Sequence, residues 1–203
     1  MDVSKLLLTT AAGGTVATGT YLTKDYWLPS SKEEKKTIAN KSVSQFLVEN
    51  QYTLLDTNSQ DKWSEVLEKY KKAYPQGITE VSKLQSYCKD LLDKKGFGES
   101  DYKEARRWCV SPVSVNNRLS LFGRKALSTE TSQNADDTQW NGKLSSHANA
   151  LSNKLSREFS GDASANLKAI KEECKTLNDK TNDEESFDED FSKSMSWCSV
   201  DSQ

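Results

Sequence analysis

The chain contains little histidine, proline or glycine: one His, three Pro and nine Gly among 203 residues. A single histidine excludes a metal site with three His ligands, and it excludes a Ser-His-Asp triad in each half of the chain. The scarcity of Pro and Gly permits long helices. Apolar residues make up only 34 % of the chain. We therefore expect a small core that needs support besides apolar burial.

Sequence motifs for common cofactors are also missing. Neither G-x-G-x-x-G nor G-x-x-x-x-G-K-[ST] occurs, and no C-x-x-C pair supports thiol–disulfide catalysis. The acidic stretch 183–190 lacks the glycine and the terminal glutamate of a calcium loop. We interpret it as a solvated loop, with weak divalent-ion binding as the alternative. We expect no cofactor, no catalytic site and no metal site, and no enzymatic activity.

An uncharged run, residues 6–23, lies near the N-terminus between two lysines. As a helix it would be about 27 Å long, near the lower limit for crossing a bilayer. We interpret residues 1–30 as a single-pass membrane anchor or uncleaved signal, and residues 31–41 as a linker. The alternatives are secretion after cleavage near Gly13 or Ala17, and an ordinary buried helix. The lysines after the run favour a cytoplasmic body, whereas the cysteines favour an extracellular body, which we prefer.

From Ser42 to the C-terminus the chain contains one pattern twice. Ser42 matches Ser114 and Cys109 matches Cys198, so the offset rises from 72 (114 − 42) to 89 (198 − 109) residues. Such a rise is expected if the second copy has longer loops. We predict two units, residues 42–112 and residues 113–203. The repeat-defining positions, all expected in the core, are Trp63, Leu67, Tyr70, Leu84 and Trp108 in the first unit and Trp140, Leu144, His147, Ile170 and Trp197 in the second.

Apolar residues within each unit recur at helical spacing. Trp63, Leu67 and Tyr70 follow one another at steps of four and three, which places them on one face of a helix. The predicted fold is mainly α, with an N-terminal apolar helix and two tandem helical repeats. We expect Asp101 and Asp190 to be N-caps of the last helix in each unit. The expected helices cover 43–55, 61–73, 79–94 and 101–108 in the first unit, and 115–127, 137–159, 163–179 and 187–197 in the second.

Each unit contains two cysteines, Cys88 and Cys109 in the first and Cys174 and Cys198 in the second. Four cysteines allow three pairings, and a self-contained repeat favours one disulfide within each unit. Each bridge would stabilise the fold by about 3 kcal/mol in the chain-entropy picture, and would fit an oxidising compartment. The alternatives are buried free thiols in a cytoplasmic protein and a four-cysteine zinc site that joins the units.

The one histidine, His147, stands where the first unit has Tyr70, on the apolar face of a helix. We interpret it as a packing residue rather than a catalytic base. Four of the five tryptophans recur at matching positions, which indicates roles in the core or over the disulfides. The net charge is −2, and no basic groove alternates with the aromatic residues. These features exclude nucleic acid as a partner.

A family resemblance rests on an N-terminal apolar segment followed by W-x3-L-x2-Y, L-x3-C-K and a terminal W-C. This ordered set resembles the large paralogous families of uncharacterised, N-terminally anchored proteins of haemotropic mycoplasmas. The second copy departs from it at His147 and Ile170. The resemblance implies a wall-less bacterium on red cells and a body displayed to the host, but no activity. The residues that carry it are Leu6-Leu7-Leu8, Trp63, Leu67, Tyr70, Leu84, Cys88-Lys89 and Arg107-Trp108-Cys109.

These observations together predict a membrane-anchored surface protein that acts as a non-enzymatic host-interaction or antigenic module. Its expected partners are the membrane, through the N-terminal helix, and a host-cell or serum protein. The oligomeric state stays open. The alternative is an envelope structural or scaffold protein that acts through helix–helix contacts. A hydrolase that uses scattered Asp, Glu and Ser residues is a third hypothesis, which no motif favours.

Overall fold

The computed structural model describes residues 40–132 and 135–202. The expected anchor, residues 1–30, and nearly all of the linker lie outside the described residues. Within them the chain forms eight helices, so the predicted mainly helical fold is confirmed. None of these helices is both long and apolar enough to cross a bilayer. They are α2 (Val43–Glu49), α3 (Gln60–Ala73), α4 (Val81–Asp93), α5 (Glu99–Trp108), α6 (Val115–Leu121), α7 (Asp137–Ala148), α8 (Ala163–Asp179) and α9 (Phe187–Trp197).

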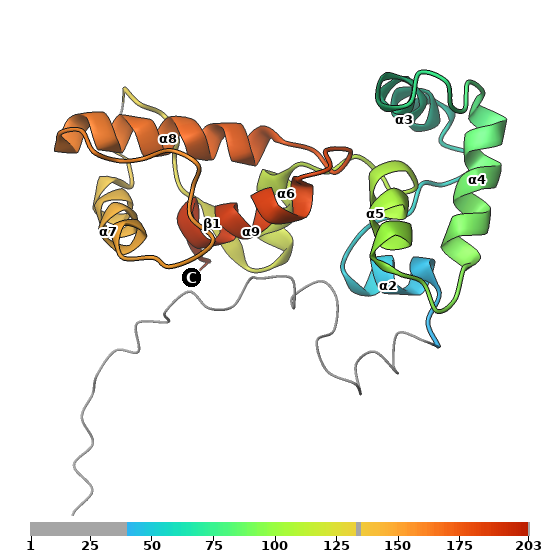
Figure 1. Ribbon diagram of the computed structural model, residues 1–203, viewed down its shortest axis with the longest axis horizontal. Coiled ribbons are helices and arrows are strands. Elements are labelled where there is room, and N and C mark those ends of the chain that lie inside the picture. The colour runs from blue at the N-terminus through green and yellow to red at the C-terminus, as the bar shows by residue number, and fades with distance from the viewer. Residues whose placement is uncertain (1–39, 133–134, 203) are drawn as a thin grey trace, which may run out of the picture.

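The helices form two lobes (Figure 1). Helices α2–α5, which belong to the first unit, form the lobe on the right of the view, and α6–α9 form the other. A two-stranded antiparallel sheet in the second lobe pairs β1 (Arg124–Ala126) with β2 (Ser199–Asp201). The lobes meet where α5 lies against the chain that enters α9, since Arg106 and Arg107 donate to carbonyls of Asn182 and Asp183.

The same backbone hydrogen bonds recur in both units. The N–H of Val43 donates to Lys94 O at 3.0 Å, and that of Val115 donates to Lys180 O at 2.9 Å. The Trp63 indole N–H donates to the carbonyl of Asp56 at 2.9 Å. In the second unit the Trp140 indole N–H donates to the carbonyl of Ser128 at the same distance. Each pair of bonds fixes the first helix of its unit, and the segment after it, to the remaining helices.

The first helix of each unit is shorter than predicted, which corrects the expected ranges 43–55 and 115–127. After α2, Gln51 has a φ of +62°, and after α6, Gly123 has a φ of +66°, so both helices end in the left-handed region. The chain then becomes extended, because Leu55 and Leu127 donate to the carbonyls of Cys109 and Cys198. The side chains of both leucines are buried, but these residues belong to extended segments rather than to helices.

Two further predictions about helix boundaries are wrong. The helix expected over 137–159 ends at Ala148, and residues 149–162 form a loop before α8. Asp101 and Asp190 are not N-caps, because α5 begins after Gly98 and α9 begins after Ser186. Both aspartates lie within the first turns of their helices, where a negative charge interacts favourably with the helix dipole.

The disulfides are Cys88–Cys109 and Cys174–Cys198, so the expected pairing is confirmed. Both bridges have a Cα–Cα distance of 5.4 Å. The first joins α4 to the end of α5, and the second joins α8 to the end of α9. All four cysteines are buried.

The core is divided into two clusters, and the first of them crosses between the lobes. It contains buried residues of α2–α5 together with Val115, Leu119, Phe187 and Phe191 of the second unit. The smaller cluster surrounds Trp140 in the second lobe. Of the predicted repeat-defining positions, all are buried except Leu144, which is partly buried. The first unit therefore relies on the second to complete its core.

Candidate functional site at the junction of the two units

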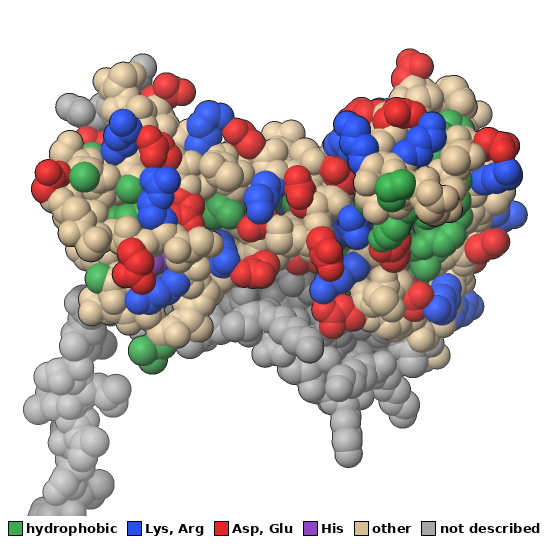
Figure 2. All heavy atoms as spheres, turned by 45° about the horizontal axis from the view of Figure 1, so that its top comes forward, with side chains coloured by type: hydrophobic (Ala, Val, Ile, Leu, Met, Phe, Trp, Pro, Cys, Tyr) green, Lys and Arg blue, Asp and Glu red, His purple; other side chains and the backbone are tan. Residues whose placement is uncertain are grey.

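Charged side chains of both signs lie along the hollow between the lobes (Figure 2). Two arginines in the protein interior, Arg106 of α5 and Arg118 of α6, are 0 % exposed. A buried guanidinium must find hydrogen-bond acceptors or a counter-charge, or else it is strongly destabilising. Both arginines have partners in the opposite unit, and Arg118 also lies near rings of its own unit, so the two side chains define the junction.

Arg106 binds the segment that precedes α9. Its guanidinium donates to the carbonyl oxygen of Asn182 and, at 3.2 and 3.3 Å, to that of Glu184. Its Nε lies 3.3 Å from a carboxylate oxygen of Asp188, and its guanidinium carbon lies 5.2 Å from the centre of the Phe187 ring. One side chain of the first unit thereby contacts four residues of the second.

Arg118 reaches in the other direction, from α6 into the first unit. Its Nη2 donates to the carbonyl of Asn50 at 2.9 Å. The guanidinium carbon lies 3.8 Å from the centre of the Tyr52 ring and 5.3 Å from that of Phe191. A cation over an aromatic face is attracted by the ring quadrupole, and the attraction is stronger when both are desolvated.

Asn182 connects the same two segments through its amide. Its Oδ1 accepts from the N–H of Val113 at 2.7 Å, and its Nδ2 donates to the carbonyl of Arg106 at 2.8 Å. The side chain is buried, so both ends of the amide are satisfied within the protein. The short connection between α5 and α6 is thus fixed to the chain that follows α8.

The acidic stretch 183–190 lies against this junction, which corrects its interpretation as a solvated loop. Asp183 lies 2.9 Å from Lys69 Nζ, and its carbonyl accepts from Arg107 Nε at 2.9 Å. Asp190 lies 2.8 Å from Lys180 Nζ. Several of its carboxylates thus face cations across and within the junction. Across the described ranges 40–132 and 135–202, no group of three or more His, Cys, Asp or Glu residues could hold a metal ion.

Burial governs the ionisation of the junction. It raises the pKa of Asp188 above its ordinary value, although the guanidiniums of Arg106 and Arg118 oppose the shift. Burial also raises the pKa of Tyr52 to about 12 and that of Tyr102 well above its usual range. The phenols therefore stay neutral at physiological pH. The charged groups that remain are the guanidiniums of Arg106 and Arg118 and the single carboxylate of Asp188.

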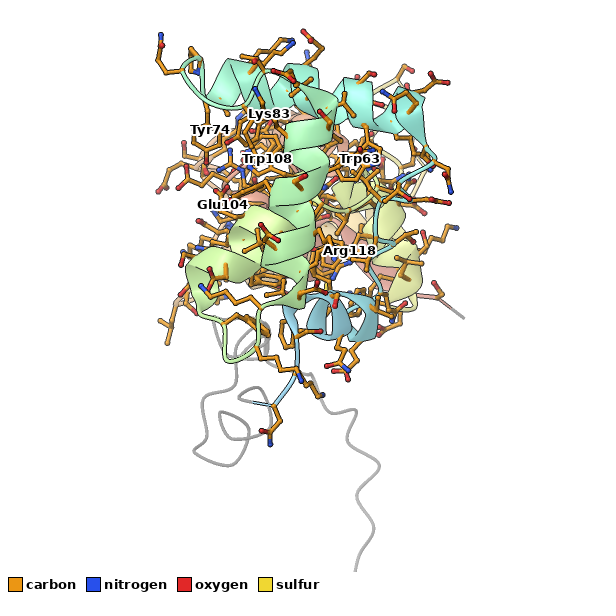
Figure 3. The ribbon with its side chains drawn as sticks, turned by 90° about the vertical axis from the view of Figure 1, so that its right-hand side faces the viewer. Trp63, Tyr74, Lys83, Glu104, Trp108 and Arg118 are labelled. Atoms are coloured by element: carbon orange, nitrogen blue, oxygen red, sulfur yellow. A yellow bond between two sulfur atoms is a disulfide. The ribbon has the colours of Figure 1, made fainter. Side chains whose placement is uncertain are left out.

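A second polar cluster adjoins the junction in the first unit, where Tyr74, Glu104 and Trp108 lie close together beside α4 (Figure 3). Glu104 accepts from the hydroxyls of Tyr74 at 2.9 Å and Tyr87 at 3.4 Å. Burial, followed by the charge of Glu104, raises the pKa of Tyr87 to about 12. The Arg107 guanidinium carbon lies 4.7 Å from the centre of the Trp108 ring. This cluster links α3, α4 and α5 to the arginine that binds Asp183.

Arg106, Arg118 and Asn182 are not among the residues that the sequence pattern indicated. One signal was present, because Arg118 stands where the first unit has Phe46 at the offset of 72 (118 − 46). Phe46 packs within its own unit, at 5.5 Å between ring centres from Tyr102. An arginine at a position that the repeat assigns to the core indicates a partner outside the unit.

Comparisons of the chain with protein-family models, curated proteins and solved structures find no match. The resemblance to proteins of haemotropic mycoplasmas therefore stays a prediction. The geometry itself is that of a structural junction: buried cations bind carbonyl oxygens and rings, and they hold the two lobes in one arrangement.

Proposed function

We propose that the chain is a tandem duplication of one disulfide-stapled helical unit, and that it acts as a non-enzymatic interaction module on a cell surface. The observation that carries the proposal is a constant scaffold with different loops. The backbone and tryptophan hydrogen bonds recur in both units. The loops between the second and third helices differ, with residues 74–80 in one unit and 149–162 in the other. Binding residues are often carried by variable loops on a rigid scaffold.

The proposed location is the outer face of a cell membrane, with residues 1–30 as the anchor and the two lobes outside the cell. Two buried disulfides support this location, because stable disulfides form mainly in oxidising compartments. Secretion after signal cleavage is the alternative. The proposed partner is a host-cell or serum protein.

A loop exchange tests the proposal. The full chain and a variant in which residues 150–161 are replaced by residues 75–79 would be purified in the same detergent. Both would be tested for binding to red-cell membranes and to serum proteins. We expect the natural chain to bind and the exchanged chain to lose binding, while circular dichroism and both disulfides stay unchanged. Binding by neither chain would contradict the adhesive function.

The alternative function is an envelope scaffold that assembles through helix–helix contacts. The large apolar side chains exposed on the described residues are few, namely Val48, Leu121 and Leu151. Such a surface gives the lobes little apolar area for self-association. Chemical cross-linking in intact cells distinguishes the two functions, since a scaffold would give oligomers and the interaction module would give monomers or complexes with another protein.

A further inference from the structure

The loop 149–162 is attached to the second lobe at several points. The Trp197 indole N–H donates to the carbonyl of Asn153. The side-chain Nδ2 of Asn153 donates to Ser196 Oγ at 3.0 Å. The backbone N–H of Ser156 donates to a carboxylate oxygen of Glu173 at 2.6 Å. The loop also presents Leu151, whose side chain is 102 % exposed. It is therefore an exposed segment held in one conformation by α8 and α9.

His147 forms the attachment between this loop and α7. Its Nε2 accepts the backbone N–H of Leu155 at 2.9 Å, in a buried setting. The imidazole centre lies 5.0 Å from that of the Phe159 ring and 4.9 Å from that of Trp197, both edge-to-face. The residue is 6 % exposed. Nε2 can accept a hydrogen bond only while it carries no proton, because both nitrogens of an imidazolium are donors.

We propose that His147 is a pH-sensitive latch that holds the loop 149–162 against α7. A proton taken from solvent by Nε2 turns this atom from an acceptor into a donor. The buried N–H of Leu155 then loses its partner and faces a positive charge. The loop is closed while the imidazole is neutral and is released from α7 when the imidazole is protonated.

The surroundings of His147 set the pH at which the latch opens. Burial lowers the pKa of His147, and Lys154 of the loop lowers it further, whereas Glu173 of α8 and Glu158 of the loop oppose the shift. Helix α9 contributes the neutral Trp197 ring, and Lys143, four residues earlier on α7, donates to the carbonyl of Ser196. The latch therefore stays closed at neutral pH and opens in acid.

The inference stands on the His147 geometry and does not need the proposed function. The first unit lacks the device, because Tyr70 stands at the matching position and a shorter loop follows it. If the loop also contacts the partner, binding weakens in acid for the same reason.

Amide hydrogen exchange of the full chain in detergent micelles tests the latch. The protection factor of the Leu155 N–H would be measured at about pH 7.5 and then at falling pH, until the imidazole proton shifts show that His147 is protonated. We expect protection to fall about tenfold or more as His147 protonates, which corresponds to about 1.4 kcal/mol. The Leu127 N–H, which donates to Cys198 O in the same unit, is the internal control and should not change.

Two variants separate the titration from the structure of the loop. H147Q keeps an acceptor that does not titrate, so the pH step at Leu155 should vanish. H147Y introduces the residue that the first unit has at this position. It should also remove the step, and it serves as the test if H147Q fails to fold. E173Q weakens another attachment and should lower protection at both pH values; the step should remain but move to lower pH, because the charge of Glu173 raises the pKa of His147. Unchanged Leu155 protection with His147 protonated, or a step that persists in H147Q or H147Y, would overturn the proposal.

Discussion

The guanidinium carbon of Arg118 lies 3.8 Å from the centre of the Tyr52 ring, across the junction between the two units. Arg118 is 0 % exposed, and its Nη2 also donates to the carbonyl of Asn50. The repeat places Phe46 at the matching position of the first unit, where it packs on Phe97 and Tyr102. One departure from the repeated pattern thus provides one of the contacts that join the two copies.

Truncation of Arg118 tests this contact. We expect R118A to lower the free energy of unfolding by about 3 kcal/mol, because it leaves a cavity and removes a buried cation from its carbonyl and rings. Urea unfolding followed by tryptophan fluorescence measures the loss. The matched control is K83A, at an exposed site on α4, which should change stability by no more than about 0.5 kcal/mol. If R118A and K83A had equally small effects on stability, Arg118 would not stabilise the junction.

Arg106 and Asp188 should respond unequally to substitution. R106M leaves the carboxylate of Asp188 in a buried site without its 3.3 Å partner, so we expect a loss of about 3–5 kcal/mol. The pKa of Asp188 is raised in the folded chain, so its ionisation costs stability as the pH rises through the folded pKa. D188N removes this cost, and Arg106 keeps its carbonyl acceptors.

We therefore expect D188N to destabilise the protein less than R106M at neutral pH. The difference should shrink as the pH falls toward the range where Asp188 is protonated, because both chains then lack the carboxylate charge. Thermal unfolding of both variants at several pH values gives the comparison. If D188N proved the more damaging substitution, the attraction between Arg106 and Asp188 would outweigh the burial cost, contrary to the direction of the pKa shift.

The helix caps offer a matched pair of substitutions, one in each unit. Ser42 Oγ accepts from the N–H of Gln45, and Ser114 Oγ accepts from the N–H of Asn117, both at 3.2 Å. Loss of such a cap costs about 1 kcal/mol. We expect S42A and S114A to lower stability by similar amounts and S42A/S114A by roughly their sum. A large effect of one and none of the other would argue against equivalent roles of the two helices.

Local patterns predicted the two helices that the second disulfide joins. The ranges 163–179 and 187–197 coincide with α8 and α9, because their apolar spacing and flanking turn residues are local signals. The ends of α2 and α6 could not be read in this way. Leu55 and Leu127 lie in extended segments, where their backbone N–H groups donate to residues far along the chain. Both leucines are spaced as if they continued the helix, and this spacing does not reveal such a distant partner.

The junction was hidden from the sequence for a related reason. Arg106 and Arg107 look like a basic last turn that complements a helix dipole, and the acidic stretch 183–190 looks like a solvated loop. Their pairing becomes visible only when the fold brings α5 beside the chain that enters α9. Charges that are separated in sequence and opposite in sign permit such a contact but do not specify it.

Mapping of disulfide-linked peptides tests most directly whether the chain is a stapled module outside the cell. The full chain would be isolated from cell membranes, alkylated without reduction, digested with protease and examined by mass spectrometry. We expect linked peptides that join Cys88 to Cys109 and Cys174 to Cys198, and no alkylated cysteine. Alkylated free thiols at all four positions would contradict both the staples and the proposed extracellular location.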